Sequence, residues 1–154
     1  MFSSEDLCAL IEKAGVYSIE GSSVSDLLSS AVSKMALPSG LDPQVLLDEL
    51  MAREKILSTA VGNGIALPHP LKKVIENPAD QRIAVCYLKE PIDMQAPDSR
   101  KVYVFFILLT AASQKHLDIL SSIANLAKDK DFKSLLETCP DEVHLLEAIR
   151  KCGA

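Results

Sequence analysis

The sequence predicts an α/β fold in which one domain, residues 1–154, packs helices on both faces of a mixed central β-sheet. Two observations support this class. Helical periodicity dominates the beginning and the end of the chain, whereas strand-like runs dominate its middle. In addition, the run Val102–Thr110 is apolar at consecutive positions, which is typical of a central strand covered on both sides. Neither an internal repeat nor a low-complexity linker divides the chain, so we expect a single unit.

Three helices and one short extended piece are predicted in the N-terminal part of the chain. Each helix combines apolar residues at helical spacing with a capping residue at its start. The third has the strongest start signal, because Asp42 can cap it and Pro43 suits its first position. The expected segments are a helix over Ser3–Ala14, an extended piece at Val16–Ile19, a helix from Ser22 or Ser23 to about Met35, and a helix from Asp42.

The composition then changes, and a β-hairpin is predicted around Asn63-Gly64. Asn-Gly between two runs suited to strands is the strongest short-range hairpin signal. The expected pairs across this turn are Gly62 with Ile65, Val61 with Ala66, Ala60 with Leu67, Thr59 with Pro68 and Ser58 with His69. This register places His69 at the open end of the hairpin.

Strands and then helices are predicted in the remainder. Arg82–Leu88 and Val102–Thr110 are apolar runs of strand length, and Ser113 is the expected cap of the helix that follows them. Further helices are expected over Phe132–Leu136 and Pro140–Arg150. The segment Lys72–Gln81 is predicted to be the most mobile loop.

Composition excludes several classes of function. The chain has 16 basic and 21 acidic residues, a net charge of -5, no tryptophan and 5% aromatic residues, which argues against binding nucleic acid. No signal peptide or membrane helix is evident, so we expect a cytoplasmic protein with no membrane insertion. Phosphate-loop, dinucleotide-binding, serine-hydrolase and zinc-protease motifs are absent, and dispersed histidines and cysteines lack metal-site spacing. We therefore expect neither cofactor nor metal.

The segment Leu67-Pro68-His69-Pro70 is the first candidate for chemistry. Prolines on both sides of His69 remove two backbone donors and fix two φ angles, so the hairpin ladder stops here and the histidine has a pre-set backbone. A ring held in this way can face a crevice. The alternative is a solvated surface histidine without function.

Two further residues are candidates on position. His116 lies in the first turn of the helix after the buried strand, where free N–H groups and the positive end of the helix favour a phosphate-like anion. Arg53 lies at the end of the third helix, just before the hairpin. Each has a plain structural alternative: a polar residue on the helix rim for His116, and an arginine that stabilises the helix C-terminus for Arg53. His144 is assigned no chemistry.

The stretch from Arg53 through Gly62-Asn63-Gly64 to His69, followed later by Lys115-His116-Leu117, resembles a known signature. It is similar to the enzyme IIA domain of the mannitol/fructose and nitrogen-regulatory type, from the bacterial phosphoenolpyruvate-dependent phosphotransferase system. The resemblance implies that His69 accepts a phosphoryl group from the carrier HPr or a nitrogen-branch relative. It also implies that His116 and Arg53 belong to the same pocket, with Ser58 and Thr59 as further candidates for contacts with the phosphate.

The resemblance leaves the downstream role open between three alternatives. The favoured one is a nitrogen-regulatory-like phosphocarrier, since no transporter membrane domain or IIB component is present in the sequence. The second is a subunit that passes phosphate to a IIB component for fructose- or mannitol-type uptake. The third is a binding protein whose docking to a regulatory target is switched by phosphorylation. The acidic composition suggests a surface suited to a basic carrier protein.

Overall fold

A five-stranded mixed sheet forms the centre of the protein, in the order β1-β4-β5-β3-β2. The computed structural model describes residues 2–153. The strands are β1 (Val16–Ile19), β2 (Ala60–Gly62), β3 (Ile65–Ala66), β4 (Arg82–Ile92) and β5 (Val102–Leu109). β5 pairs antiparallel with β4 and parallel with β3, so it is the central strand that the sequence predicts.

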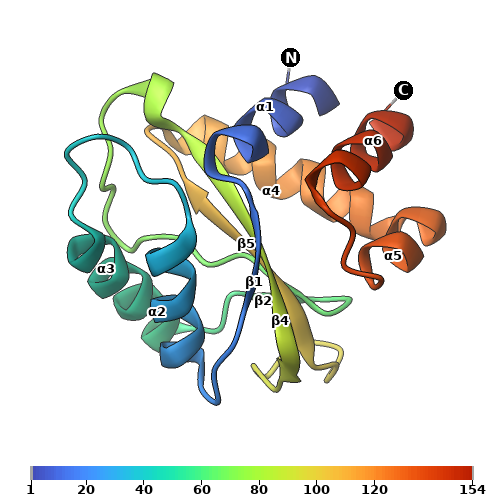
Figure 1. The fold of residues 1–154 in the computed structure, drawn as a ribbon, viewed down its shortest axis with the longest axis horizontal. Coiled ribbons are helices and arrows are strands. Elements are labelled where there is room, and N and C mark those ends of the chain that lie inside the picture. The colour runs from blue at the N-terminus through green and yellow to red at the C-terminus, as the bar shows by residue number, and fades with distance from the viewer. Residues whose placement is uncertain (1, 154) are drawn as a thin grey trace.

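Helices cover both faces of this sheet, as Figure 1 shows. On one face lie α2 (Val24–Lys34) and α3 (Pro43–Ile56). The other face carries α1 (Ser4–Ala14), α4 (Ser113–Lys128), α5 (Lys130–Leu136) and α6 (Glu142–Gly153). A 3-10 turn, η1 (Pro78–Asp80), precedes β4. The predicted fold class, a mixed sheet with helices on both sides, is confirmed.

Alternation along the two long strands divides the core into two layers. Phe106 of β5 packs towards α1 and the C-terminal helices, whereas its neighbour Phe105 packs towards α2 and α3. Both side chains are fully buried, because β5 lies in the middle of the sheet and helices cover both of its faces. The apolar run in the sequence therefore supplies both layers at once. Among residues 2–153, no helix is both long and apolar enough to span a bilayer.

Three of the predicted helix starts are correct, and one is wrong. Ser3, Ser23 and Asp42 each accept a hydrogen bond from a backbone N–H in the first turn of their helix. Ser113, in contrast, is the first residue of α4 and does not cap it. The N-cap position belongs to Ala112, whose methyl group cannot accept a hydrogen bond, so the start of α4 has no side-chain cap.

The predicted hairpin forms, but its register is wrong beyond the first pair. Gly62 lies opposite Ile65 as expected, whereas Ala66 pairs with Ala60 instead of Val61. Val61 is an extra residue on its strand, and such a bulge shifts every later pair by one position. Thr59 consequently accepts a hydrogen bond at 3.0 Å from the backbone N–H of Leu67.

The hairpin leads directly to the edge of β5. β3 pairs in parallel with β5, and the Leu108 N–H extends this pairing by donating to Pro68 O at 2.9 Å. The chain then leaves the sheet and is held against α3, where Glu49 O accepts the Leu71 N–H at 3.1 Å. His69 is thus placed between two anchored positions, one on the sheet and one on a helix. The predicted mobility of Lys72–Gln81 stays a prediction.

Candidate functional site

The ring of His69 is fixed by a hydrogen bond to its own backbone neighbourhood. Its Nδ1 lies 2.8 Å from Leu67 O, and since a carbonyl oxygen can only accept, Nδ1 carries the proton. The lone pair of the neutral ring is therefore on Nε2. The half-buried ring extends from the segment between Pro68 and Pro70, just after the strand pairing with β5 ends.

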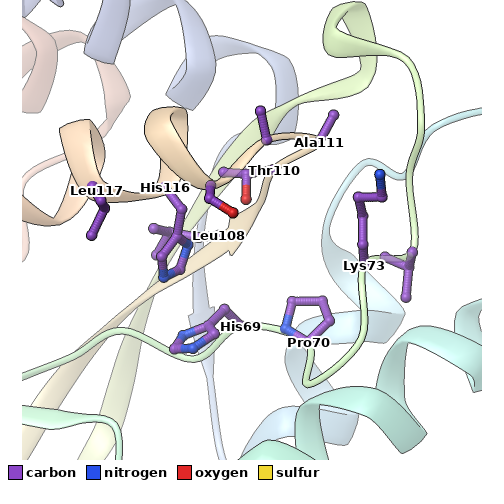
Figure 2. Close-up of a pocket in the computed structure, with 11 residues that line it drawn as sticks. His69, Pro70, Lys73, Leu108, Thr110, Ala111, His116 and Leu117 are labelled. Atoms are coloured by element: carbon purple, nitrogen blue, oxygen red, sulfur yellow. The ribbon is translucent and has the colours of Figure 1, made fainter.

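His116 brings a second imidazole to the same place. It is the fourth residue of α4, which begins after the carboxyl end of β5. The centroids of the two rings lie 4.6 Å apart, with an angle of 64° between their planes. Two candidates separated by 46 residues in the sequence are therefore direct neighbours, as Figure 2 shows.

Both imidazoles are held neutral near pH 7. Burial lowers the pKa of His69, the Leu67 hydrogen bond opposes this, and the Arg53 charge lowers the pKa again; the net result is below the ordinary value. Burial also lowers the pKa of His116, and the neighbouring His69 and Arg53 lower it further, because a second positive charge beside them is unfavourable. A neutral imidazole with a free Nε2 is a competent nucleophile that needs no strong base.

The histidines line a pocket of about 590 Å³ that is open to solvent. Its other walls come from Pro70 and Lys73 after His69, and from the loop that joins β5 to α4 (Figure 2). Ala112 ends this loop and Ser113 begins α4, a 16-residue helix without a side-chain cap. Unpaired N–H groups and the positive end of the helix at such a position favour an anion.

Neither Arg53 nor Ser58 is among the residues that line that pocket. Arg53, in the last turn of α3, donates from Nη1 to Leu57 O at 2.6 Å, and its remaining N–H groups are not engaged in this bond. Its charge is close enough to affect both imidazoles. The Ser58 hydroxyl accepts the Ala60 N–H at 3.2 Å and lines a separate surface depression.

Thr59 was a candidate for a contact with the phosphate, but its side chain is hydrogen-bonded to another residue. It is buried, and its hydroxyl donates to Glu54 Oε1 at 2.7 Å while its backbone N–H donates to Glu54 Oε2 at 2.9 Å. A hydroxyl has one hydrogen, so Thr59 has no side-chain donor left for a phosphate. Glu54 is a residue that the sequence did not single out.

Lys73 is another residue that sequence reasoning did not assign to the site. It lines the pocket and also pairs with Glu76 at 3.2 Å. Its position four residues after His69 was the available signal, but a lysine pair in a polar loop is usually solvated.

His144 lies in α6 with an exposed side chain, paired with Asp141 at 2.6 Å. Within residues 2–153, no group of three or more metal-ligating side chains is found.

A neutral imidazole with a fixed tautomer, beside a helix start that favours an anion, fits one class of protein, the histidine phosphoryl carriers. The chain belongs to a family within this class, since residues 10–152 match the model "Phosphoenolpyruvate-dependent sugar phosphotransferase system, EIIA 2". Its role is that of a phosphoryl carrier. The predicted resemblance is confirmed.

Individual relatives agree with this assignment. The chain is 36% identical over 110 residues to a nitrogen regulatory protein of Pseudomonas aeruginosa, covering 70% of each chain. It is 34% identical over 121 residues to a nitrogen regulatory protein of Escherichia coli K12, covering 77% of this chain and 71% of the relative. The crystal structure of nitrogen regulatory protein IIA-Ntr from Neisseria meningitidis superposes with a TM-score of 0.72 and 28% identity, covering 87% of this chain and 91% of that one.

Proposed function

We propose that His69 accepts a phosphoryl group on Nε2 from a phosphohistidine of an HPr-like carrier protein and then gives it up to a downstream acceptor. The Nε2 lone pair attacks phosphorus while the donor's N–P bond breaks, and the electron pair of that bond returns to the donor imidazole. One N–P bond replaces another, so the step is close to isoenergetic and needs no nucleotide. The observation that carries this proposal is the Nδ1–H bond to Leu67 O, which leaves Nε2 as the nucleophile.

The surroundings of Nε2 supply the positive charge and donors that the transferred group needs. Phosphoryl transfer depends mainly on positioning and on stabilising the equatorial oxygens, and a bound phosphoryl group carries about -1.5 to -2 charges. Arg53 can offer the guanidinium N–H groups that Leu57 does not use, His116 a ring N–H, and the start of α4 its unpaired amides. Ser58 stays a candidate for a further contact.

We assign the carrier a nitrogen-regulatory-like role, because relatives at 34–36% identity carry that name. We expect it to act in the cytoplasm, as the sequence predicts. The family description names a sugar phosphotransferase system, so transfer to a IIB component for fructose- or mannitol-type uptake is the second candidate. A phosphorylation-switched docking to a regulatory target is compatible with either role.

The decisive experiment reconstitutes the phosphorylation with phosphoenolpyruvate, enzyme I and an HPr-like carrier. Intact-mass measurement should show one acid-labile phosphoryl group on the wild-type protein and none on His69→Ala. The matched control is His144→Ala, which removes an exposed histidine outside the pocket and should be phosphorylated normally. An unmodified wild-type mass, or a label that persists in His69→Ala, would contradict the proposal.

The contributions of the neighbours are measured by rate. His116→Ala and Arg53→Ala should both remain folded and be phosphorylated more slowly than the wild type.

Adding a IIB component to the phosphorylated protein distinguishes a transport relay from a regulatory switch. Loss of the label to IIB supports a transport relay, whereas a retained label combined with phosphorylation-dependent capture of a regulatory target supports the switch.

A further inference from the structure

A continuous series of hydrogen bonds connects Glu54 to the ring of His69. Both oxygens of the Glu54 carboxylate are occupied by Thr59, one by its backbone N–H at 2.9 Å and the other by its hydroxyl at 2.7 Å. Thr59 O in turn accepts the Leu67 N–H at 3.0 Å. Leu67 O then accepts a hydrogen bond from His69 Nδ1–H, with 2.8 Å between the oxygen and the nitrogen. A carboxylate at the end of α3 is thereby connected to the imidazole through two residues.

The first connection is the strongest of the series. Hydrogen bonds to an ionised carboxylate are roughly twice as strong as those between neutral groups, and Glu54 makes two of them to one residue. Thr59 is only 5% exposed, so water does not replace either bond easily. Thr59 immediately precedes β2, which is short and contains the bulge at Val61, so the strand pairing alone fixes Thr59 poorly. Glu54 supplies the missing constraint from outside the sheet.

The orientation of Leu67 O decides which nitrogen of His69 can react. A histidine ring has two tautomers, and the one present is set by the partner of the other nitrogen. With Leu67 O in place, the proton stays on Nδ1 and Nε2 keeps its lone pair. If the Leu67 carbonyl is free to turn, the ring can place its proton on Nε2 and lose the nucleophile.

We propose that Glu54 is a positioning residue for phosphoryl transfer, which holds His69 in its reactive tautomer through Thr59 and Leu67. Glu54 does not contact the phosphoryl group, and Thr59 acts as the connector instead of a phosphate ligand. This inference rests on the proposed function, in which His69 Nε2 is the atom that is phosphorylated. It extends the site from the pocket to the buried side of the hairpin.

The test observes the tautomer of His69 in the unphosphorylated protein by nitrogen NMR of ¹⁵N-histidine, at about pH 7.5, above the ordinary histidine pKa of about 6.5. The chain has only three histidines, so the His69 signals can be assigned with His116→Gln and His144→Gln. We expect Nδ1–H in the wild type and a mixture of tautomers in Glu54→Ala. The initial rate of phosphorylation of Glu54→Ala should fall about ten- to a hundredfold.

Conservative and control variants separate positioning from general loss of structure. Glu54→Gln should retain the wild-type tautomer, because its amide oxygen can accept the Thr59 N–H and its amide nitrogen can donate to the Thr59 hydroxyl. Asp48→Ala, in the same helix, loses only a hydrogen bond to Gln44 and should behave as the wild type. If Glu54→Ala does not fold, Thr59→Val removes the hydroxyl bond alone and should shift the tautomer part of the way.

Either of two results overturns the inference: a folded Glu54→Ala that keeps the pure Nδ1–H tautomer, or one that is phosphorylated at the wild-type rate. The tautomer measurement needs no phosphate donor. If the wild type is not phosphorylated on His69, the proposed function fails, while the comparison of tautomers still decides whether Glu54 positions the ring.

Discussion

Replacing Gly64 by alanine tests how tightly the hairpin turn is packed on the sheet. Gly64 has a φ of +78°, and a Cβ at this position would overlap the ring of Tyr103 on β5. Gly40 has a similar φ of +86°, but nothing lies within 4 Å of a Cβ there. Gly40→Ala therefore carries the strain of a left-handed conformation, about 1–2 kcal/mol, partly offset by about 0.4–1 kcal/mol from the stiffer unfolded chain.

Those two contributions are the same in both variants, so they cancel in the comparison. What remains for Gly64→Ala is the overlap with Tyr103, and forcing extra atoms into a packed site costs about 1–3 kcal/mol. The free energy of unfolding, obtained from urea denaturation followed by circular dichroism, should therefore be about 1–3 kcal/mol lower for Gly64→Ala than for Gly40→Ala. Equal values for the two variants would refute the packing of the turn against Tyr103.

Two further predictions concern the core and the histidine pair. Phe106→Ala should lower the free energy of unfolding by about 3–5 kcal/mol, because it empties a buried site between the sheet and the C-terminal helices. The control is Val143→Ala, at an exposed site. A shift of the urea midpoint smaller than the shift in this control would contradict the prediction. The free energy of unfolding should also decline as the pH falls below about 6.5, because the pKa values of His69 and His116 are lowered in the folded state and the unfolded chain then binds more protons. Urea titrations at several pH values should show a smaller decline in the double variant His69→Gln, His116→Gln, and an undiminished decline would assign the effect to other groups.

The hairpin illustrates what local sequence signals can and cannot predict. The turn at Asn63-Gly64 and the first pair, Gly62 with Ile65, are set by local backbone preferences, so the sequence predicts them correctly. The bulge at Val61 does not follow from the Asn-Gly signal, and the tip of the hairpin also has a contact with a distant part of the chain. Asp98, in the loop between β4 and β5, accepts the Asn63 N–H at 2.8 Å and holds the tip of the hairpin. No periodicity within the hairpin itself contains that information.

The site shows the same division between local and distant causes. His69 and His116 have local signals, namely flanking prolines and a helix start after a buried strand, and the structure places their rings 4.6 Å apart. The partner of Thr59 could not be read from the sequence, because it depends on how α3 meets the hairpin. The prediction that Ser113 caps α4 was wrong for a similar reason. The path of the chain after β5 decides which residue precedes the helix, and that residue is Ala112.

The site draws its groups from both helical layers of the protein. Arg53 comes from α3, which packs on one face of the sheet, and His116 comes from α4 on the other face. His69 follows β3, in the sheet between them. A chain in which only one layer has docked has only part of the pocket. On the proposed function, we therefore expect a chain in which only one helical layer has docked to accept the phosphoryl group poorly. The amount of labelled protein should then follow the amount of fully folded protein and not the total amount synthesised.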